Sequence, residues 1–251
     1  FTNSRGVVLA GIRTIKDPQS HDIFIFCHGL TGSMMFDFFP ELSEKLPYNT
    51  FRFDFTGNGQ SQGDFSVGEY LRDVEDLRDA VTYLRRQGFL VQGVGGHSKG
   101  AIVALMYNKQ FGDVPLTIAI SSRFYMQEIT PSFQRSLKAL HTSGFIKVRS
   151  RGREYTFTLD AVKETNAYNM QEVCNLCRRA VVVIHGDRDQ THHVKDAYAT
   201  INALGSKFVN SFIIPEADHC FTNTIAEVIE AIRLSIESYS LQYGFNPEAS
   251  L

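Results

Sequence analysis

The chain has 251 residues and a formal net charge of −2, from 25 basic and 27 acidic side chains. This balance excludes a nucleic-acid binder that works through bulk positive charge, and equally an acidic tail protein. The length, with 43% hydrophobic and 21% charged residues, favours one globular α/β domain and excludes extensive disorder.

Short β-branched or aromatic runs recur along the chain and predict strands. Most are apolar on both faces, which is typical of a parallel sheet that helices cover on both sides. The predicted strands are Ile23–Cys27, Thr50–Phe53, Leu90–Val94, Leu116–Ile120, Ala180–Ile184 and Phe208–Ile214.

Amphipathic stretches between these strands predict helices. One runs from Tyr70 to Leu84, with apolar residues three and four apart and charged residues on the other face. A second runs from Val194 to Leu204 and is closed by Gly205. A third covers Ile225 to Ile236. This alternation of strands and helices predicts an open, doubly wound α/β sheet.

The segment between Ser121 and Ala180 breaks the alternation. Within it, Phe145–Arg149 and Tyr155–Leu159 flank a turn at Gly152 and predict a β-hairpin. Its basic side chains favour a solvated face over a phosphate site. We therefore predict a single domain over residues 1–251, with an insertion at about residues 122–176. The insertion is expected above the C-terminal edge of the sheet, where α/β folds bind ligands.

The segment Gly96-His97-Ser98-Lys99-Gly100 lies between an apolar strand and a helix-forming run. A glycine two residues to either side of a serine permits the tight strand-to-helix turn that lifts the hydroxyl above a sheet. The motif therefore predicts Ser98 as a nucleophile. A dinucleotide site is disfavoured, because Ser98 stands where the third glycine of that motif would be.

A serine hydroxyl needs a base, and the base needs an orienting carboxylate. His219 follows the last predicted strand, and Asp189 follows the strand at Ala180–Ile184. The order Ser98, Asp189, His219 is the one expected at the strand ends of this fold. Asp187 stays open as a rival acid, whereas Asp218 is too close to His219 along the backbone to reach its Nδ1 easily. The other nearby histidines are expected to be structural. His97 packs below the tight turn at Ser98, which is called a nucleophile elbow, His185 ends a strand, and His192 and His193 begin a helix.

The developing oxyanion needs preorganised N–H donors. The backbone amide directly after the nucleophile, that of Lys99, is one candidate. Leu30 is the second, because Gly29 lets the chain turn the next amide toward Ser98. For the Lys99 side chain two alternatives stay open: it has no chemical role, or it attracts an anionic group of the substrate.

Nothing in the sequence indicates a cofactor or a metal. A phosphate-cradling G-x-x-x-x-G-K-[ST] loop is absent, and Cys174 and Cys177 lack the second pair that a zinc site needs. Four cysteines are too few for a disulfide scaffold, and the longest apolar run, Ala101–Tyr107, is too short for a membrane helix. We expect a cytoplasmic protein with no cofactor, no metal, no nucleic-acid partner and no integral membrane association.

Four motifs together resemble those of α/β hydrolases: His28-Gly29, Gly96-x-Ser98-x-Gly100, His185-Gly186-x-x-Asp189 and Asp218-His219. Within that superfamily, residues 53–63, the lysine of the elbow and Gly144-Phe145-Ile146 are similar to cinnamoyl (feruloyl) esterase-like hydrolases and their plant relatives. The similarity covers roughly residues 6 to 240. It departs at Ala101, where typical members have a second glycine. The resemblance implies an eight-stranded, mostly parallel sheet, a Ser98–His219–Asp189 triad and a cap built from the insertion.

These features predict a serine esterase that cleaves a small, largely apolar or aromatic ester through an acyl-enzyme. A thioesterase, a monoacylglycerol-type lipase or an aminopeptidase shares the same residues, and a slow-turnover small-molecule receptor of this fold stays open. Aromatic side chains of the insertion are candidates for the substrate pocket or for a small core of its own: Phe124, Tyr125, Phe133, Phe145, Tyr155 and Phe157.

Overall fold

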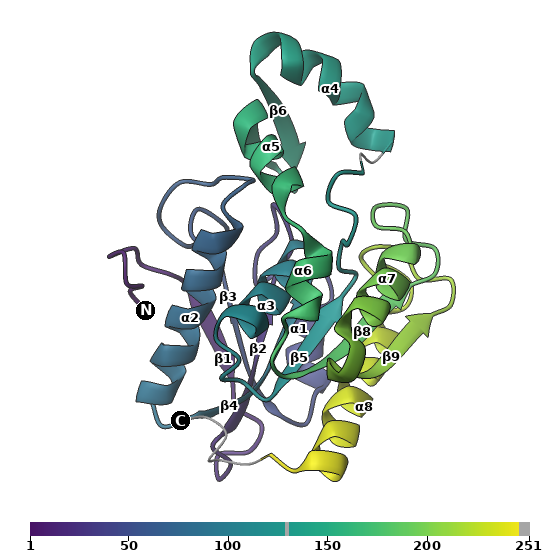
Figure 1. Cartoon of the computed structure of the whole chain (residues 1–251). Helices are drawn as coiled ribbons and strands as arrows, with labels where there is room; N and C mark the ends of the chain where they lie inside the picture. The colour runs from purple at the N-terminus through teal and green to yellow at the C-terminus, as the bar shows by residue number, and fades with distance from the viewer. Residues whose placement is uncertain (129–130, 246–251) are drawn as a thin grey trace.

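The computed structural model describes residues 1–128 and 131–245. In this part of the chain a seven-stranded sheet forms the centre of the molecule (Figure 1). The strand order is β1-β3-β2-β4-β5-β8-β9, and all strands are parallel except β1, which pairs antiparallel with β3. The strands are β1 Gly11–Thr14, β2 Asp22–Cys27, β3 Asn49–Phe53, β4 Leu90–His97, β5 Leu116–Ile120, β8 Ala180–Gly186 and β9 Phe208–Ile214. The predicted doubly wound, mostly parallel α/β sheet is confirmed.

The strand count differs from the eight that the resemblance implied. Strand β1 alternates between exposed and half-buried residues, so it lacks the apolar run that marks the central strands. The residues before it add no further strand and form one isolated bridge, between Thr2 and Val8. The carbonyls of Val8 and Ala10 accept backbone hydrogen bonds from the loop at residues 54–62. These bonds extend the pairing of β1 with β3, and the sheet has seven strands in the described residues.

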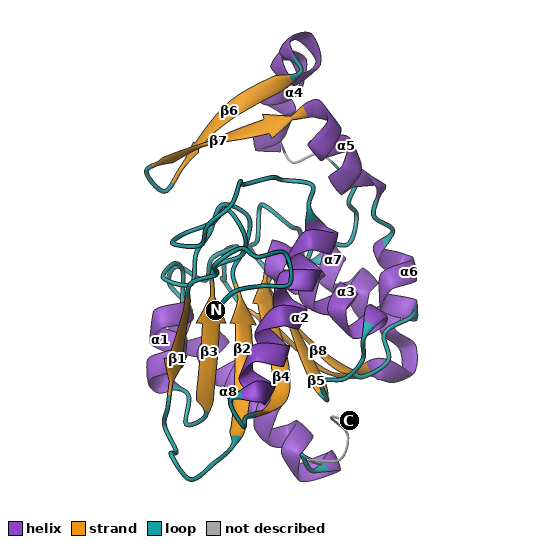
Figure 2. Ribbon diagram, turned by 90° about the vertical axis from the view of Figure 1, so that its left-hand side faces the viewer, coloured by secondary structure: helices purple, strands orange, loops and turns teal. Residues whose placement is uncertain are grey.

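Helices cover both faces of the sheet (Figure 2). One face carries α2 (Tyr70–Arg86), α3 (Lys99–Gln110), α6 (Met170–Asn175) and α7 (Lys195–Leu204), which is followed by the 3₁₀ turn Gly205–Lys207; the other carries α1 (Phe39–Lys45) and α8 (Ile225–Tyr243). In β2, Ile25 belongs to the first core, and Phe24 and Phe26 belong to the second. Alternate residues of a strand point to opposite faces, so a sheet covered on both sides needs uninterrupted apolar runs.

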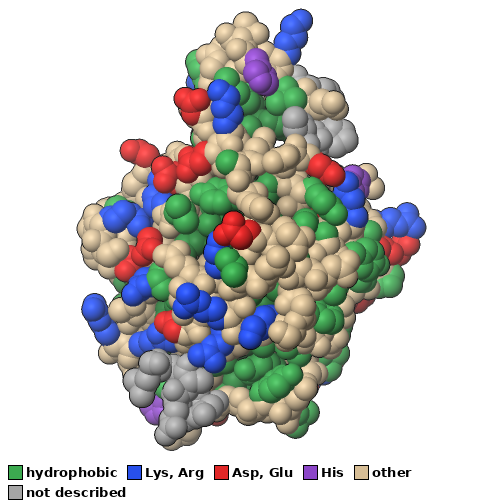
Figure 3. All heavy atoms as spheres, in the orientation of Figure 1, with side chains coloured by type: hydrophobic (Ala, Val, Ile, Leu, Met, Phe, Trp, Pro, Cys, Tyr) green, Lys and Arg blue, Asp and Glu red, His purple; other side chains and the backbone are tan. Residues whose placement is uncertain are grey.

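The insertion stands above the C-terminal edge of the sheet and forms a separate lobe on the surface (Figures 2 and 3). It contains α4 (Pro131–Ser143), β6 (Phe145–Ser150), β7 (Arg153–Thr158) and α5 (Leu159–Ala167). Strands β6 and β7 pair antiparallel, so the predicted hairpin is confirmed, with Gly152 at its turn. A small core fills the lobe and includes Leu140, Tyr155, Phe157 and Val162. Helix α6, the last element of the predicted insertion, packs instead on α3 and α7.

The predicted helices correspond to α2, α7 and α8. Gly205 follows α7 with φ +53°, in agreement with the predicted glycine stop. Among the described residues, no helix is both long enough and apolar enough to span a bilayer.

Candidate active site

Ser98 lies at the junction of β4 and α3, in the strained conformation of a nucleophile elbow (φ +56°, ψ −117°). The flanking glycines are required sterically. A Cβ at Gly96 would overlap the carbonyl of Gly100, and a Cβ at Gly100 would overlap the carbonyl of Cys27. The Ser98 amide donates to the carbonyl of Ile120 in β5, at 2.9 Å. Helix and strand therefore cross closely beneath the serine and present its hydroxyl at the edge of the sheet.

The structure brings Ser98, His219 and Asp189 together. His219 Nε2 lies 3.1 Å from Ser98 Oγ, and His219 Nδ1 lies 2.7 Å from Asp189 Oδ2. The carboxylate accepts the Nδ1–H proton, which leaves Nε2 free to accept the serine proton. Asp189 is itself held by the backbone N–H groups of Thr191 and His192, each at 2.8 Å from Oδ1.

The charge of Asp189 is strongly stabilised. Burial acts to raise the pKa of this carboxyl, but hydrogen bonds from His185 and His219 outweigh burial and hold the pKa well below its usual range. Asp189 is therefore a carboxylate at neutral pH, as an orienting group for an imidazole must be.

The two rival acids face other partners. Asp187 accepts the backbone N–H of Glu216 at 2.7 Å, and Asp218 accepts those of Cys220 and Thr222 at 3.1 and 2.8 Å. Both carboxylates thus stabilise local turns beside the site, and the Nδ1 contact of His219 is made by Asp189.

Two further histidines flank His219, with ring centroids 4.8 Å away for His97 and 4.7 Å away for His192. His97 Nε2 donates to the carbonyl of His219 at 2.7 Å, so the residue before Ser98 is linked to the loop that carries His219. His192 Nδ1 donates to the carbonyl of Ser121 at 3.0 Å. The expectation that His97 packs beneath the elbow agrees with its burial against Phe38. His192 borders the pocket, a position that its place before a helix did not reveal.

Both candidate oxyanion donors belong to segments that border Ser98. Lys99 is the first residue of α3, and Leu30 lies in the turn after β2. A Cβ at Gly29 would lie only 3.2 Å from the Cβ of Ser98, so this turn approaches the serine closely. His28 holds the turn, because its Nδ1 donates to the Gly29 carbonyl at 2.8 Å and its Nε2 accepts the Phe55 N–H at 3.1 Å.

The Lys99 side chain forms a buried ion pair. Its Nζ lies 2.7 Å from Asp73 Oδ2 in α2, and the side chains are only 5% and 1% exposed. The ammonium also lies 5.0 Å from the centre of the Tyr70 ring. The positive charge of Lys99 is therefore compensated within the protein, which weakens the option that this side chain attracts an anionic substrate group.

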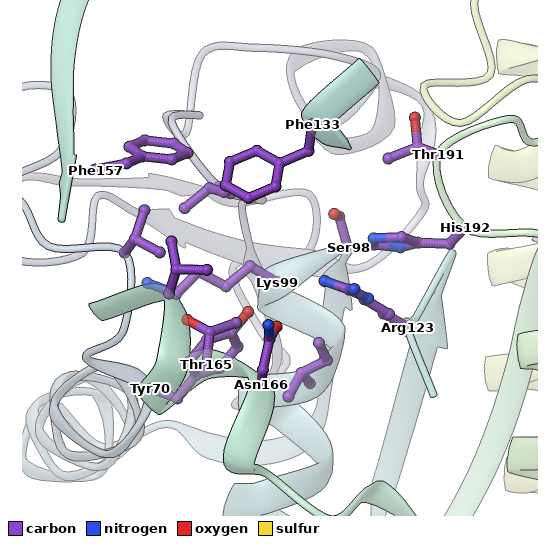
Figure 4. A pocket seen from close by; sticks show the side chains of 14 residues that line it. Tyr70, Ser98, Lys99, Arg123, Phe133, Phe157, Thr165, Asn166, Thr191 and His192 are labelled. Atoms are coloured by element: carbon purple, nitrogen blue, oxygen red, sulfur yellow. The ribbon is translucent and has the colours of Figure 1, made fainter. Parts of the chain in front are cut away.

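A cavity of about 190 Å³ opens beside Ser98 (Figure 4). Most of its wall area is apolar, although half of the lining residues are polar, among them Arg123, Asn166 and His192. Of the six aromatic candidates in the insertion, Phe133 and Phe157 line this cavity, and Phe145 is exposed. The full lining is Leu30, Val67, Tyr70, Ser98, Lys99, Ile102, Arg123, Phe133, Phe157, Val162, Thr165, Asn166, Thr191 and His192.

The tip of the β6–β7 hairpin is anchored to the loop that follows β2. Arg151 pairs with Asp37 at 2.5 Å, and its guanidinium lies over the ring of Phe36 at 4.6 Å. Thr31 Oγ1 donates to Ser150 Oγ at 3.0 Å. The insertion therefore contacts the same loop that carries Leu30. The sequence shows that the hairpin is basic, but it does not indicate that Asp37 is the partner of Arg151.

Cys174 and Cys177 are free and buried on the α6 side of the sheet. Among the described residues, no group of three or more His, Cys, Asp or Glu side chains is placed to hold a metal ion.

A nucleophile elbow at the C-terminal edge of a mostly parallel sheet, with an imidazole and a carboxylate from later strand ends, defines the class of α/β hydrolases. The chain belongs to the alpha/beta hydrolase family, whose model matches residues 24–231. A comparison with curated protein sequences gives no significant match.

Solved structures of similar fold include several esterases. Est1E from Butyrivibrio proteoclasticus, bound to ferulic acid, is 17% identical with a TM-score of 0.76, over 94% of this chain and 97% of that one. The esterase domain of a Rhodothermus marinus protein is 24% identical with a TM-score of 0.70, over 97% of both chains. The Pyrococcus furiosus esterase Pf2001 is 20% identical with a TM-score of 0.69, over 94% of this chain and 90% of that one. At these identities the likeness concerns the fold.

Proposed function

We propose that the protein is a serine esterase that cleaves a small, largely apolar or aromatic carboxylic ester. The observation that carries this proposal is the continuous hydrogen-bonded chain from Asp189 through His219 to Ser98, which ends at a pocket. A serine hydroxyl becomes an effective nucleophile only beside such an oriented base.

The proposed reaction has two steps. Ser98 Oγ attacks the acyl carbonyl while His219 Nε2 takes its proton, and the amides of Leu30 and Lys99 stabilise the oxyanion. His219 then protonates the leaving alcohol, and an acyl-enzyme remains. A water molecule, activated by the same imidazole, cleaves the acyl-enzyme, and Asp189 stabilises the imidazolium in both steps.

The size of the pocket suits a small acyl or alcohol group. A dry cavity of about 150 Å³ accommodates benzene, so 190 Å³ accommodates one ring with a few further atoms. Phe133 and Phe157 supply aromatic wall for such a group. This agrees with the narrower resemblance to cinnamoyl (feruloyl) esterase-like and plant hydrolases, which we retain as part of the proposal, and with a structural neighbour that holds ferulic acid.

The proposal is tested by Ser98→Ala. Hydrolysis of p-nitrophenyl butyrate is expected to fall by at least ~10³-fold, because the remaining groups provide no nucleophile. A fluorophosphonate probe should label the wild type and fail to label the variant. An unchanged urea midpoint shows that the fold is intact. Wild-type turnover by Ser98→Ala contradicts the mechanism, and labelling of the wild type without multiple turnovers favours a receptor.

A matched pair of variants tests the assigned acid. Asp189→Asn is expected to lower kcat by about 10⁴-fold, since the amide stabilises the wrong tautomer of His219. Asp187→Asn is the control and should stay close to the wild-type rate. A panel of esters, thioesters and aminoacyl amides, ranked by kcat/KM, then separates the esterase from a thioesterase, a lipase or an aminopeptidase.

A further inference from the structure

Arg123 places a guanidinium in the wall of the substrate pocket. It follows β5 and enters the cavity between Ser98 and Asn166 (Figure 4). Its Nε donates to the carbonyl of Tyr125 at 3.3 Å, and Nη2 donates to the carbonyl of Glu128. Within the described residues, the other terminal nitrogen, Nη1, has no hydrogen-bond partner. The side chain thus holds its own loop and still presents N–H donors to the cavity.

The charge of Arg123 is not compensated at close range. In the described part of the chain it forms no ion pair, and its nearest acids are engaged elsewhere. Glu128 pairs with Lys195 at 2.6 Å. Asp196 accepts the backbone N–H groups of Phe124 and Tyr125, at 2.6 and 3.0 Å. Both act on Arg123 only through longer-range attraction, while burial lowers the pKa of the guanidinium.

The other basic side chains of the pocket add no net charge. Lys99 is neutralised by Asp73 at 2.7 Å. Burial lowers the pKa of His192 to about 3, so this imidazole is neutral at pH 7. Arg123 is therefore the one described pocket-lining side chain whose positive charge lacks a counterion, and no Asp or Glu is among the lining residues.

We infer that the substrate carries a carboxylate, which Arg123 binds while Ser98 attacks the ester. This inference rests on the proposed esterase function and narrows its substrate class to esters with a second, anionic group. A guanidinium binds a carboxylate through charge-assisted hydrogen bonds, which are strengthened in a pocket with little water. Because the cavity is small, the carboxylate lies within a few bonds of the ester. An α-amine would be repelled, which argues against an aminopeptidase.

Two matched substrate pairs test the inference. Monomethyl glutarate is compared with methyl pentanoate for a carboxylate on the acyl side, and 4-acetoxybutanoate with butyl acetate for one on the alcohol side. Release of acid is followed in a pH-stat. In the wild type, kcat/KM for the carboxylate ester of one pair is expected to exceed that of its neutral partner at least about tenfold. The pair that shows the preference identifies the side.

Variants then assign the preference to Arg123. Arg123→Gln should abolish the preference in kcat/KM for the carboxylate ester over its neutral partner, mainly through a higher KM for the carboxylate ester. Arg123→Lys should retain part of this preference. Arg86→Gln, which removes an exposed positive charge from the end of α2, is the control and should keep the wild-type ratio. If Arg123→Gln does not fold, competition in the wild type decides: glutarate should inhibit more strongly than pentanamide.

The outcomes separate this inference from the proposed function. A wild type that hydrolyses neutral esters without preferring either carboxylate ester overturns the inference and leaves the esterase intact. An unchanged ratio in Arg123→Gln also overturns it. A wild type that hydrolyses no ester overturns the proposed function itself.

Discussion

The imidazoles of His97 and His192 differ from that of His219 in what surrounds them. Burial lowers the pKa of His97 to about 4 and that of His192 to about 3, and the nearby His219 lowers both further. Each donates one N–H to a backbone carbonyl, on the His219 loop and on the end of β5 respectively. At neutral pH these two rings act as neutral supports that position the loops of the site.

This burial predicts a pH-dependent stability. In the unfolded chain these histidines become protonated below their usual pKa of about 6.5. In the folded chain they stay neutral until the pH falls to about 4 for His97 and about 3 for His192. The free energy of unfolding should therefore fall by about 1–2 kcal/mol for each of these histidines between pH 6.5 and 5. Urea unfolding at the two pH values measures the fall.

In His97→Gln the free energy of unfolding should fall less between pH 6.5 and 5, because the variant lacks one of the two histidines that only the unfolded chain protonates in this range. His141→Gln, at an exposed position on the insertion, is the matched control and should keep the wild-type pH dependence. Identical pH dependence in His97→Gln and the wild type would show that the burial of His97 does not govern the effect.

At the scale of elements, the hairpin tip and the loop after β2 act as one unit. Asp37 has a side chain only 7% exposed, adopts φ +56° and lies 3.9 Å from His97 Nδ1, so its charge needs the guanidinium of Arg151. The hydroxyl of Tyr155 in β7 also donates to the carbonyl of Thr31, at 3.3 Å. The position of the turn that carries Leu30 therefore depends on a segment more than a hundred residues away in sequence.

Removal of this anchor should affect activity. Arg151→Ala leaves Asp37 without its counterion, and we expect a several-fold loss of kcat/KM together with about 1 kcal/mol or more of stability. Arg149→Ala, on the exposed part of β6, is the control and should match the wild type in both. Adding Asp37→Asn to Arg151→Ala should restore part of the loss. Equal behaviour of the two arginine variants would exclude the anchor.

At the scale of the whole molecule, a buried ion pair lies between α2 and α3, the two helices whose apolar side chains belong to the first core. Lys99 and Asp73 are both removed from water, and burial raises the pKa of the Asp73 carboxyl although Lys99 acts to lower it. A buried pair of this kind contributes little net stability, but loss of one partner leaves an uncompensated charge in the interior.

Asp73→Asn is therefore expected to reduce the free energy of unfolding by about 3–5 kcal/mol. The double variant Asp73→Leu/Lys99→Met should lie much closer to the wild type, because both charges are gone. Glu154→Gln, which breaks the exposed pair with Lys147, is the control and should change stability by about 0.5 kcal/mol or less. Urea denaturation measures all three. A double variant less stable than Asp73→Asn would argue against this account of the pair.

Local patterns determined much of the fold and the candidate residues. Apolar runs predicted six of the seven strands, since central strands of a covered sheet are buried on both faces. The seventh strand, β1, was not predicted, because its residues alternate like a surface segment and form no such run. The glycines around Ser98 predicted the elbow because the steric demand there is local.

What the tertiary structure decided are the partners of charged and polar side chains, because these depend on distances between segments that no local pattern encodes. The sequence named Ser98, Asp189 and His219, left Asp187 open, and could not say where Lys99 points. The fold directs Asp187 to a turn, pairs Lys99 with Asp73, anchors Arg151 on Asp37 and leaves Arg123 facing the cavity. Composition predicted a chain of nearly balanced charge, and only packing shows that one positive charge in the pocket is left without a counterion.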